Sequence, residues 1–243
     1  KRRIVAVIGD GAAEFEHVHE LAAWPEAAFT GIVPLRDPGP RERCPTHRRV
    51  IKTAIDAAFV PYREAATYVS VVRDPKDVFV STYHFIFGVF DLFDAVTLEE
   101  WLALFLSPQF PGGSWARHTA SWWALRERPN VRVLPFAALK RDLPGAVRSV
   151  AAAMRVELDE AELARVAERC SFEHMQQHED RFAPPRMLFT RSRAKMVRAG
   201  KVGGSGELLS RSQQAAIDRY FQAELAALGS DFPYAELFDV VDG

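Results

Sequence analysis

The sequence is poor in cysteine, lacks a long apolar run and carries almost no net charge. Only Cys44 and Cys170 are cysteines among 243 residues, too few for a disulfide scaffold, so a reducing, cytoplasmic location is expected. A transmembrane helix needs roughly eighteen or more consecutive apolar residues, and the sequence has no such run. The formal net charge of −1 argues against nucleic acid or an anionic membrane as a partner held by bulk charge.

Other features are those of a globular protein. The chain is 48% hydrophobic and 26% charged, and its length suits one large domain over residues 1–243. The start, KRRIVAVIGDGAAEF, is basic and then apolar, but Asp10 follows soon after the apolar residues. The apolar run is too short for a signal peptide.

Short β-branched runs alternate with helical patterns. Strands are expected at 48–53, 66–73 and 130–137, and helices at about 74–87, 97–107, 113–128 and 212–228, with two or three more before Met175. Asp74 is a plausible N-cap with Pro75 in the first turn, and Thr97 begins a capping box. Strands separated by helices predict an α/β fold with a parallel sheet.

Arg73 lies where a buried strand gives way to a helix. Ligands of parallel α/β sheets bind outside the carboxyl ends of the strands, and Ser81 lies on the same side of the following helix as its start. A guanidinium and a hydroxyl in these places are able to grip one phosphate. The alternative is structural: Arg73 pairs with Asp77 or a helix C-terminus, and Ser81 only packs.

Six segments together resemble the sulfotransferases that use 3′-phosphoadenosine 5′-phosphosulfate (PAPS). YVSVVRDPKDVFVSTYHF is similar to the family's strand and helix for the 3′-phosphate, and RRVIKT to the strand that carries K-T-H. The others are GSWARHTASWW, VLPFAALKRDL, CSFEHM and MVRAGKVGGSGELLS. The similarity covers roughly residues 20–228 and implies a three-layer α/β sandwich around a central parallel sheet, of the P-loop nucleotide-hydrolase type.

The resemblance also implies roles for individual residues, with PAPS as co-substrate, its product PAP (3′,5′-adenosine diphosphate) and no metal. Arg73 and Ser81 would bind the 3′-phosphate, and Arg198 and Gly200 would close over it. Phe172 would stack on the adenine, with contacts from Cys170 and Phe136, and Lys52 would lie beside the sulfuryl group. The partner would be a small molecule with a hydroxyl group; the oligomeric state is left open.

Several positions depart from the family pattern. Ala54 stands at the general-base histidine of K-T-H, and Phe136 at the tyrosine of Y-E-D. Ala137 and Ala199 replace an acidic and a basic residue, and Gly204-Ser205 stands at D-W. The phosphosulfate loop P-K-S-G-T-T-W is not found before residue 20: either its residues are missing from the sequence as printed, which we favour, or the chain lacks the loop.

Another histidine is needed if the chain is to supply a base. His118 matches a histidine of the family's G-S-W segment on the acceptor side and is the better surrogate. His84 is interpreted as a packed or hydrogen-bonded structural histidine. His174 and His178 are spaced i, i+4 but have no third metal ligand, and His17 and His19 lie in the stretch with the weakest match. A weaker base suffices if the acceptor is acidic, such as a phenol.

The aromatic run FIFGVFDLF allows two interpretations. Phe85, Phe87 and Phe90 either belong to the core or line an apolar acceptor pocket. Trp122 and Trp123 are expected to pack under the sheet.

Three functions compete at this stage. The first is sulfuryl transfer from PAPS to an alcohol, phenol or glycan hydroxyl. The second is a degenerate relative that binds the nucleotide without transferring sulfate, an interpretation that Ala54 suggests. The third, a kinase or other P-loop enzyme, requires GxxxxGK[ST] and magnesium carboxylates, and neither pattern is present.

Overall fold

A computed structural model describes residues 15–27, 31–182, 195, 197, 198 and 200–242. The chain divides into two compact units, each made of two segments: unit 1 holds residues 1–54 and 138–200, and unit 2 holds residues 55–137 and 201–243. Among the described residues, no helix combines the length and the apolar character needed to cross a bilayer.

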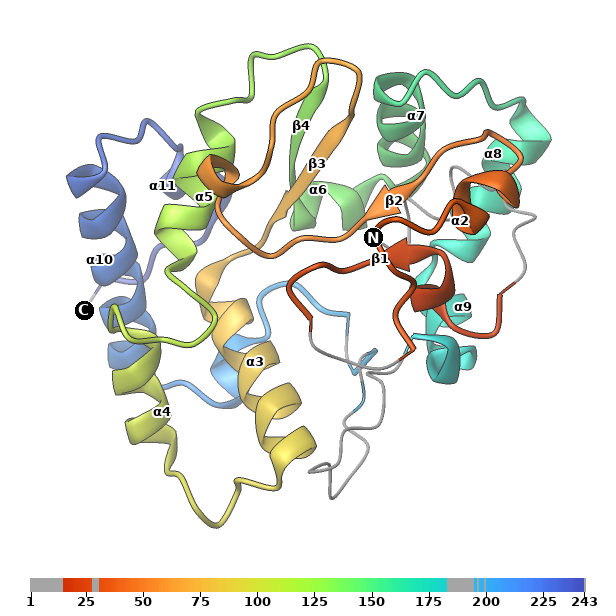
Figure 1. Ribbon diagram of the computed structural model, residues 1–243. Coiled ribbons are helices and arrows are strands. Elements are labelled where there is room, and N and C mark those ends of the chain that lie inside the picture. The colour runs from red at the N-terminus through yellow and green to blue at the C-terminus, as the bar shows by residue number, and fades with distance from the viewer. Residues whose placement is uncertain (1–14, 28–30, 183–194, 196, 199, 243) are drawn as a thin grey trace. The chain divides into compact units, whose positions relative to one another are not determined.

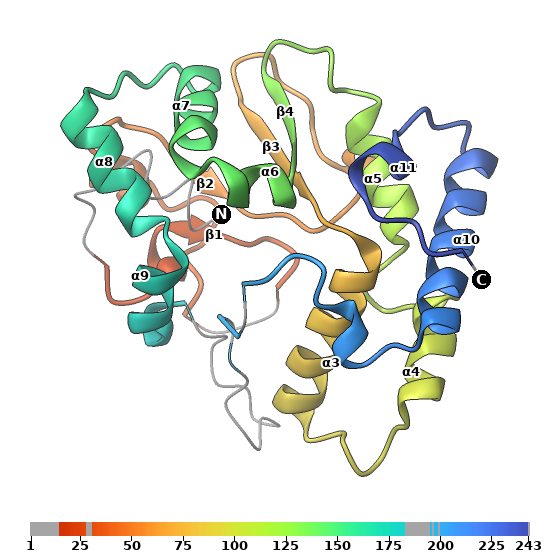
Figure 2. The ribbon, with the colours of Figure 1, turned by 180° about the vertical axis from the view of Figure 1, so that it is seen from behind.

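Unit 1 contains a short parallel strand pair and a run of helices. Strand β1 (Ala22–Ala23) pairs with β2 (Val50–Ile51), with Ala22 opposite Val50. The helical elements are η1 (Val18–Glu20), α2 (Gly39–Glu42), α7 (Leu143–Ala153), α8 (Glu160–Arg169), α9 (Phe172–Gln177) and η3 (Glu179–Arg181). Helix α8 packs between α7 and α9 (Figure 2). Helix α6 (Phe136–Arg141) runs from unit 2 into unit 1.

Unit 2 is built on a longer parallel pair, β3 (Tyr68–Val72) and β4 (Val131–Pro135), which lie side by side in Figure 1. Its helical elements are η2 (Ala57–Phe59), α3 (Pro75–Phe90), α4 (Leu98–Phe105), α5 (Trp115–Trp123), η4 (Ser205–Glu207), α10 (Arg211–Ala227) and α11 (Tyr234–Leu237). Helix α10 packs against both α5 and α3. Residues 55–137 and 201–243, which residues 138–200 separate in the sequence, therefore form one unit.

Helix α3 begins and ends where local signals place it. The Asp74 side chain accepts a hydrogen bond from the Lys76 N–H at 2.8 Å, which satisfies one of the unpaired amides at the helix start. At the other end Asp91 adopts φ 58° and ψ 54°, the left-handed conformation that stops a helix. The helix thus runs one turn beyond the predicted end near Phe87.

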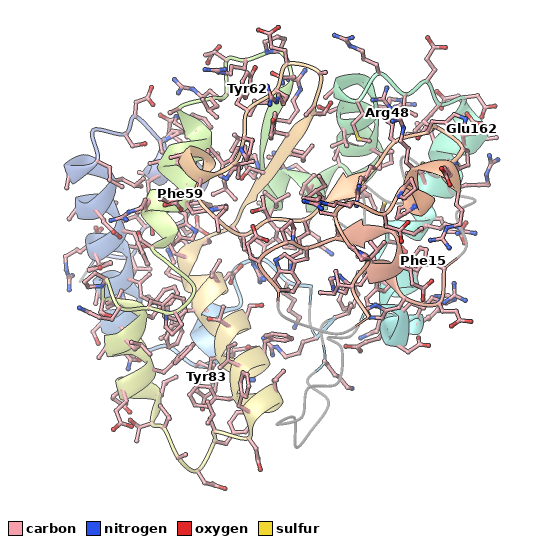
Figure 3. The ribbon with its side chains drawn as sticks, in the orientation of Figure 1. Phe15, Arg48, Phe59, Tyr62, Tyr83 and Glu162 are labelled. Atoms are coloured by element: carbon pink, nitrogen blue, oxygen red, sulfur yellow. The ribbon has the colours of Figure 1, made fainter. Side chains whose placement is uncertain are left out.

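Aromatic side chains fill the core of unit 2. Phe79, Phe87 and Phe221 are almost completely buried and belong to one cluster that includes Val72 and Trp101. Tyr83, labelled in Figure 3, packs against Phe87 in a tilted arrangement with ring centroids 4.1 Å apart. Phe87 is therefore a core residue, as in the structural interpretation, whereas Phe90 is 39% exposed.

A buried ion pair joins three parts of unit 2. Lys76 Nζ lies 2.6 Å from Asp218 Oδ1, and the Tyr234 hydroxyl donates to the same oxygen at 2.6 Å. The Val241 N–H donates to Asp218 Oδ2, and Lys76 donates to the Asp239 carbonyl. Burial and the hydrogen bond to Asp218 raise the pKa of Tyr234 far above its usual range. The network holds helix α3, helix α10 and residues 239–241 together.

Candidate functional site

The predicted site residues follow the carboxyl ends of both strand pairs. Arg73 comes directly after β3 and Phe136 directly after β4, so the two leave the same edge of one parallel pair. Lys52 follows β2, and Trp24 follows β1. This is the edge at which parallel α/β sheets bind ligands.

Arg73 is held by the protein on several sides. Its guanidinium carbon lies 5.0 Å from the centroid of the Phe136 ring, and the Trp115 Nε1–H donates to its backbone carbonyl at 2.9 Å. Nη2 donates to the Lys201 carbonyl at 3.0 Å and lies 3.5 Å from Asp77 Oδ2. The ion pair between Arg73 and Asp77, which the structural interpretation predicts, is thus present in unit 2.

The ion pair leaves one donor of Arg73 unused. Nε is buried and has no hydrogen-bond partner among the residues that the structure describes. A buried N–H without an acceptor costs about 1–3 kcal/mol, and an anion oxygen is the acceptor that a guanidinium prefers. Arg73 therefore fits an anion site as well as an ion pair. Ser81 lies exposed on helix α3 of the same unit.

Asp77 ties the later loop to the start of α3. Its carboxylate, almost fully buried, accepts hydrogen bonds from the Gly203 N–H at 3.1 Å and the Gly204 N–H at 3.0 Å. Because Arg73 donates to the Lys201 carbonyl, both members of the Arg73–Asp77 ion pair hold residues 201–204. The sequence identified Asp77 only as a partner of Arg73; its bonds to the loop have no sequence signal.

The other predicted nucleotide contacts lie in unit 1. Phe172 begins helix α9, whose N-cap is Ser171, and Lys140 Nζ lies 5.5 Å from its ring centroid. Gly200 has φ +58°, and a Cβ there would overlap the Phe172 ring. Cys170 is buried and caps α8, and Arg198 is exposed. Ala199 lies outside the described residues.

Lys52 is positioned within unit 1 by Trp24. Its backbone N–H donates to the Ala23 carbonyl at 2.8 Å, which extends the β1–β2 pairing by one residue. Its Nζ lies 3.1 Å from the centroid of the Trp24 ring, a cation–π contact. The ammonium group is thus held at the carboxyl edge of the strand pair. Sequence reasoning did not find Trp24.

His118 lies on α5, one turn after Trp115, with about a third of its side chain exposed. Burial lowers the pKa of its imidazole, against the charge of Asp56 and a backbone hydrogen bond with Ile55, which raise it. The imidazole is accordingly neutral at neutral pH, as a proton acceptor must be. His84, in contrast, pairs with Glu207 at 3.4 Å.

The remaining histidines have different surroundings. His174 and His178 stack with centroids 4.3 Å apart. His17 and His19 also stack, at 5.2 Å, within η1 and its cap. The segment in which the phosphosulfate loop was sought, residues 1–14, lies outside the described residues.

Comparisons with known proteins agree on one family. Residues 40–229 match the model of the "Sulfotransferase domain". The chain is 27% identical over 189 residues to "Sulfotransferase 1C2" of Oryctolagus cuniculus, covering 76% of this chain and 64% of that protein. It is 27% identical over 194 residues to "Sulfotransferase 1B1" of Mus musculus, covering 76% and 63%. The chain thus spans less than two thirds of these relatives.

Solved structures show the same fold. Retinol dehydratase in complex with androsterone and the inactive cofactor PAP gives a TM-score of 0.66 at 22% identity, over 79% of this chain and 57% of that one. A mouse sulfotransferase complexed with PAP gives 0.63 at 25% identity, over 74% and 66%. The predicted α/β fold of the P-loop-like sulfotransferase type is confirmed.

Proposed function

The chain belongs to the sulfotransferase domain family, and from this premise we propose that it transfers a sulfuryl group from PAPS to a hydroxyl group of a small-molecule, glycan or lipid acceptor. The observation that carries the proposal is Arg73. It stands at the carboxyl end of β3, and its buried Nε has no partner within the described part of the chain, which fits a phosphate oxygen.

The chain's own residues supply two kinds of contact to the nucleotide. By resemblance, the residues that would hold the 3′-phosphate are Arg73, Ser81, Arg198 and the backbone of Gly200. The rings of Phe172 and Phe136 offer apolar contacts to the adenine, next to Cys170. Phe136 lacks a tyrosine's hydroxyl, but its ring still contacts Arg73.

Transfer itself needs charge stabilisation and a base. When bound, PAPS supplies an activated sulfuryl group. The Lys52 ammonium would neutralise charge that develops on the departing oxygen, a role that electrostatic stabilisation fills without a metal. His118, neutral and partly exposed, would accept the proton of the acceptor hydroxyl. Cys44 and Cys170 are both buried thiols rather than halves of a disulfide, which supports a cytoplasmic location.

One observation favours a second candidate. Ala54 removes the histidine that the family places after Lys52 and Thr53, and no imidazole replaces it at that position. A relative that binds PAP or PAPS without efficient transfer would have this pattern.

Calorimetry with PAP tests the nucleotide site. We expect the wild-type protein to bind PAP and Arg73→Ala to abolish the binding, because the variant loses a charged donor that faces the phosphate. Arg126→Ala is the matched control, since Arg126 pairs with Asp231 at 2.8 Å outside the proposed site. Unchanged affinity in Arg73→Ala would refute the assignment. Sulfate transfer from labelled PAPS across alcohols, phenols and glycans then separates the two candidates, since the degenerate relative binds PAP but gives no product.

A further inference from the structure

The segment that lacks the family's histidine carries an acid two residues later. Ala54 is followed by Ile55 and Asp56, and Asp56 forms the N-cap of η2. Its Oδ1 lies 3.9 Å from His118 Nδ1 on helix α5. Both residues belong to unit 2, so the pair is formed within one compact unit.

Hydrogen bonds hold η2 and α5 together beside this pair. The Ala57 N–H, next to Asp56, donates to Ser121 Oγ at 3.0 Å. The same hydroxyl donates to the His118 carbonyl at 2.9 Å. Ser121 therefore links the backbone of both partners, and Asp56 is fixed relative to His118 by more than its own side chain.

The surroundings of the imidazole assign roles to its two nitrogens. Among the described residues, buried Nδ1 has no hydrogen-bond partner at normal distance, and the acid that it faces is Asp56; the Ile55 backbone also forms a hydrogen bond with the imidazole and, like Asp56, raises its pKa. An N–H at Nδ1 is stabilised by a carboxylate, which leaves the lone pair on Nε2. Hydrogen bonds of catalytic groups are often long before the substrate binds, so 3.9 Å is compatible with a bond that shortens in the complex.

We propose that His118 is a relocated base and that Asp56 is its positioning residue. Together the two residues replace the histidine that is absent at position 54. The inference rests on the proposed function. As the acceptor oxygen forms its bond to sulfur, the bond between sulfur and the oxygen of the nucleotide's 5′-phosphate breaks, and that oxygen keeps the electron pair. The acceptor's proton moves to His118 Nε2, and Asp56 stabilises the resulting imidazolium.

Position also favours His118 over His84. The Trp115 indole on the same helix contacts the backbone of Arg73, so α5 links the base to the end of β3. Phe59, labelled in Figure 3, lies three residues after Asp56 and is 72% exposed, so η2 presents an apolar side chain close in sequence to Asp56. His84 is engaged by Glu207.

Five variants test the proposal by kinetics. Because a general base contributes about 100-fold or more, we expect His118→Asn to lower kcat by about that factor, with imidazole restoring part of the rate in His118→Ala. Asp56→Asn should lower kcat by roughly tenfold or more with KM little changed. His84→Asn and Asp94→Asn, a charge-matched change at an exposed site, should keep wild-type rates.

The pH profile separates positioning from mere support of the fold. Activity that needs neutral His118 rises with pH through its pKa. Asp56 raises that pKa, so Asp56→Asn should move the rising limb of kcat/KM to lower pH and lower the plateau. A variant that only loosened η2 would lower the plateau without moving the limb.

Nuclear magnetic resonance of the imidazole gives a readout without turnover. We expect His118 in the wild-type protein to carry its proton on Nδ1 and to titrate at a higher pH than in Asp56→Asn. Equal titration in the two proteins, or full rates in Asp56→Asn and His118→Asn, would overturn the inference alone. A wild-type protein that binds PAP but transfers sulfate to no acceptor would refute the proposed function and the inference with it.

Discussion

Arg73 divides its donors between the protein and the proposed phosphate. Nη2 bonds to Lys201 and lies near Asp77, while buried Nε finds no partner in the residues described by the structure. A lysine would keep the charge but not the fork of parallel N–H groups. We expect Arg73→Lys to bind PAP at least about tenfold more weakly than the wild type, the value of one charge-assisted hydrogen bond, as measured by calorimetry. Wild-type affinity in this variant would mean that charge alone suffices.

Gly200 is required by two separate constraints. Its φ of +58° disfavours any side chain, and a Cβ would overlap the Phe172 ring. Gly229 has φ +63° with nothing within 4 Å of such a Cβ, which makes it a matched control. Both alanine variants should lose roughly 1–2 kcal/mol of stability from the left-handed backbone.

The affinity for PAP should distinguish the Gly200→Ala variant from the Gly229→Ala variant. Gly200→Ala displaces the ring that we propose for the adenine and should weaken PAP binding in calorimetry. Gly229→Ala should bind PAP normally. Equal affinities in the two variants would argue against a role for Phe172 in the site.

Helix α3 and the loop of residues 201–204 act as one element through Asp77. Its two oxygens accept the amides of Gly203 and Gly204. An asparagine keeps one acceptor and turns an NH₂ group toward the other amide. We expect Asp77→Asn to lower the free energy of unfolding by about 1–3 kcal/mol and to speed hydrogen exchange at both glycines. Glu99→Gln, at an exposed position, is the control; slow exchange retained in Asp77→Asn would show that the loop is held by other contacts.

Local sequence signals predicted where helices begin better than they predicted which elements pair or pack with each other. The Asp74 cap and the Thr97 capping box are both present, because such hydrogen bonds join residues two or three positions apart. Strand β1 has only two residues, too few for any pattern, and exists through its pairing with β2. The α5 helix ends at Trp123, five residues before its predicted end.

The same limit applies to the site. Arg73 was found by its place after a strand, which is a local feature. The contacts of Trp115, Asp56 and Trp24 join residues from 28 to 62 positions apart, and a single sequence contains no record of such distances. Resemblance supplied the remaining residues, since nothing in CSFEHM alone points to an adenine.

At the scale of the molecule, the family and the fold class were predicted correctly from six segments in order. That order carries information that no single segment has, because no one motif is decisive by itself. The division into two units was not predicted, since each unit is assembled from two distant stretches of chain. The single-domain assignment stays a prediction.

The ion pair between Lys76 and Asp218 makes residues 239–241 part of the framework of unit 2. Asp239 and Val241 each give a backbone group to that pair, and Lys76 lies two residues after Asp74, the helix cap that follows Arg73. Deleting residues 239–243 would leave two buried charges short of partners, at a cost of about 1–3 kcal/mol, measurable by denaturant unfolding. Loosening of residues 239–241 would therefore also loosen the helix start next to the proposed phosphate site.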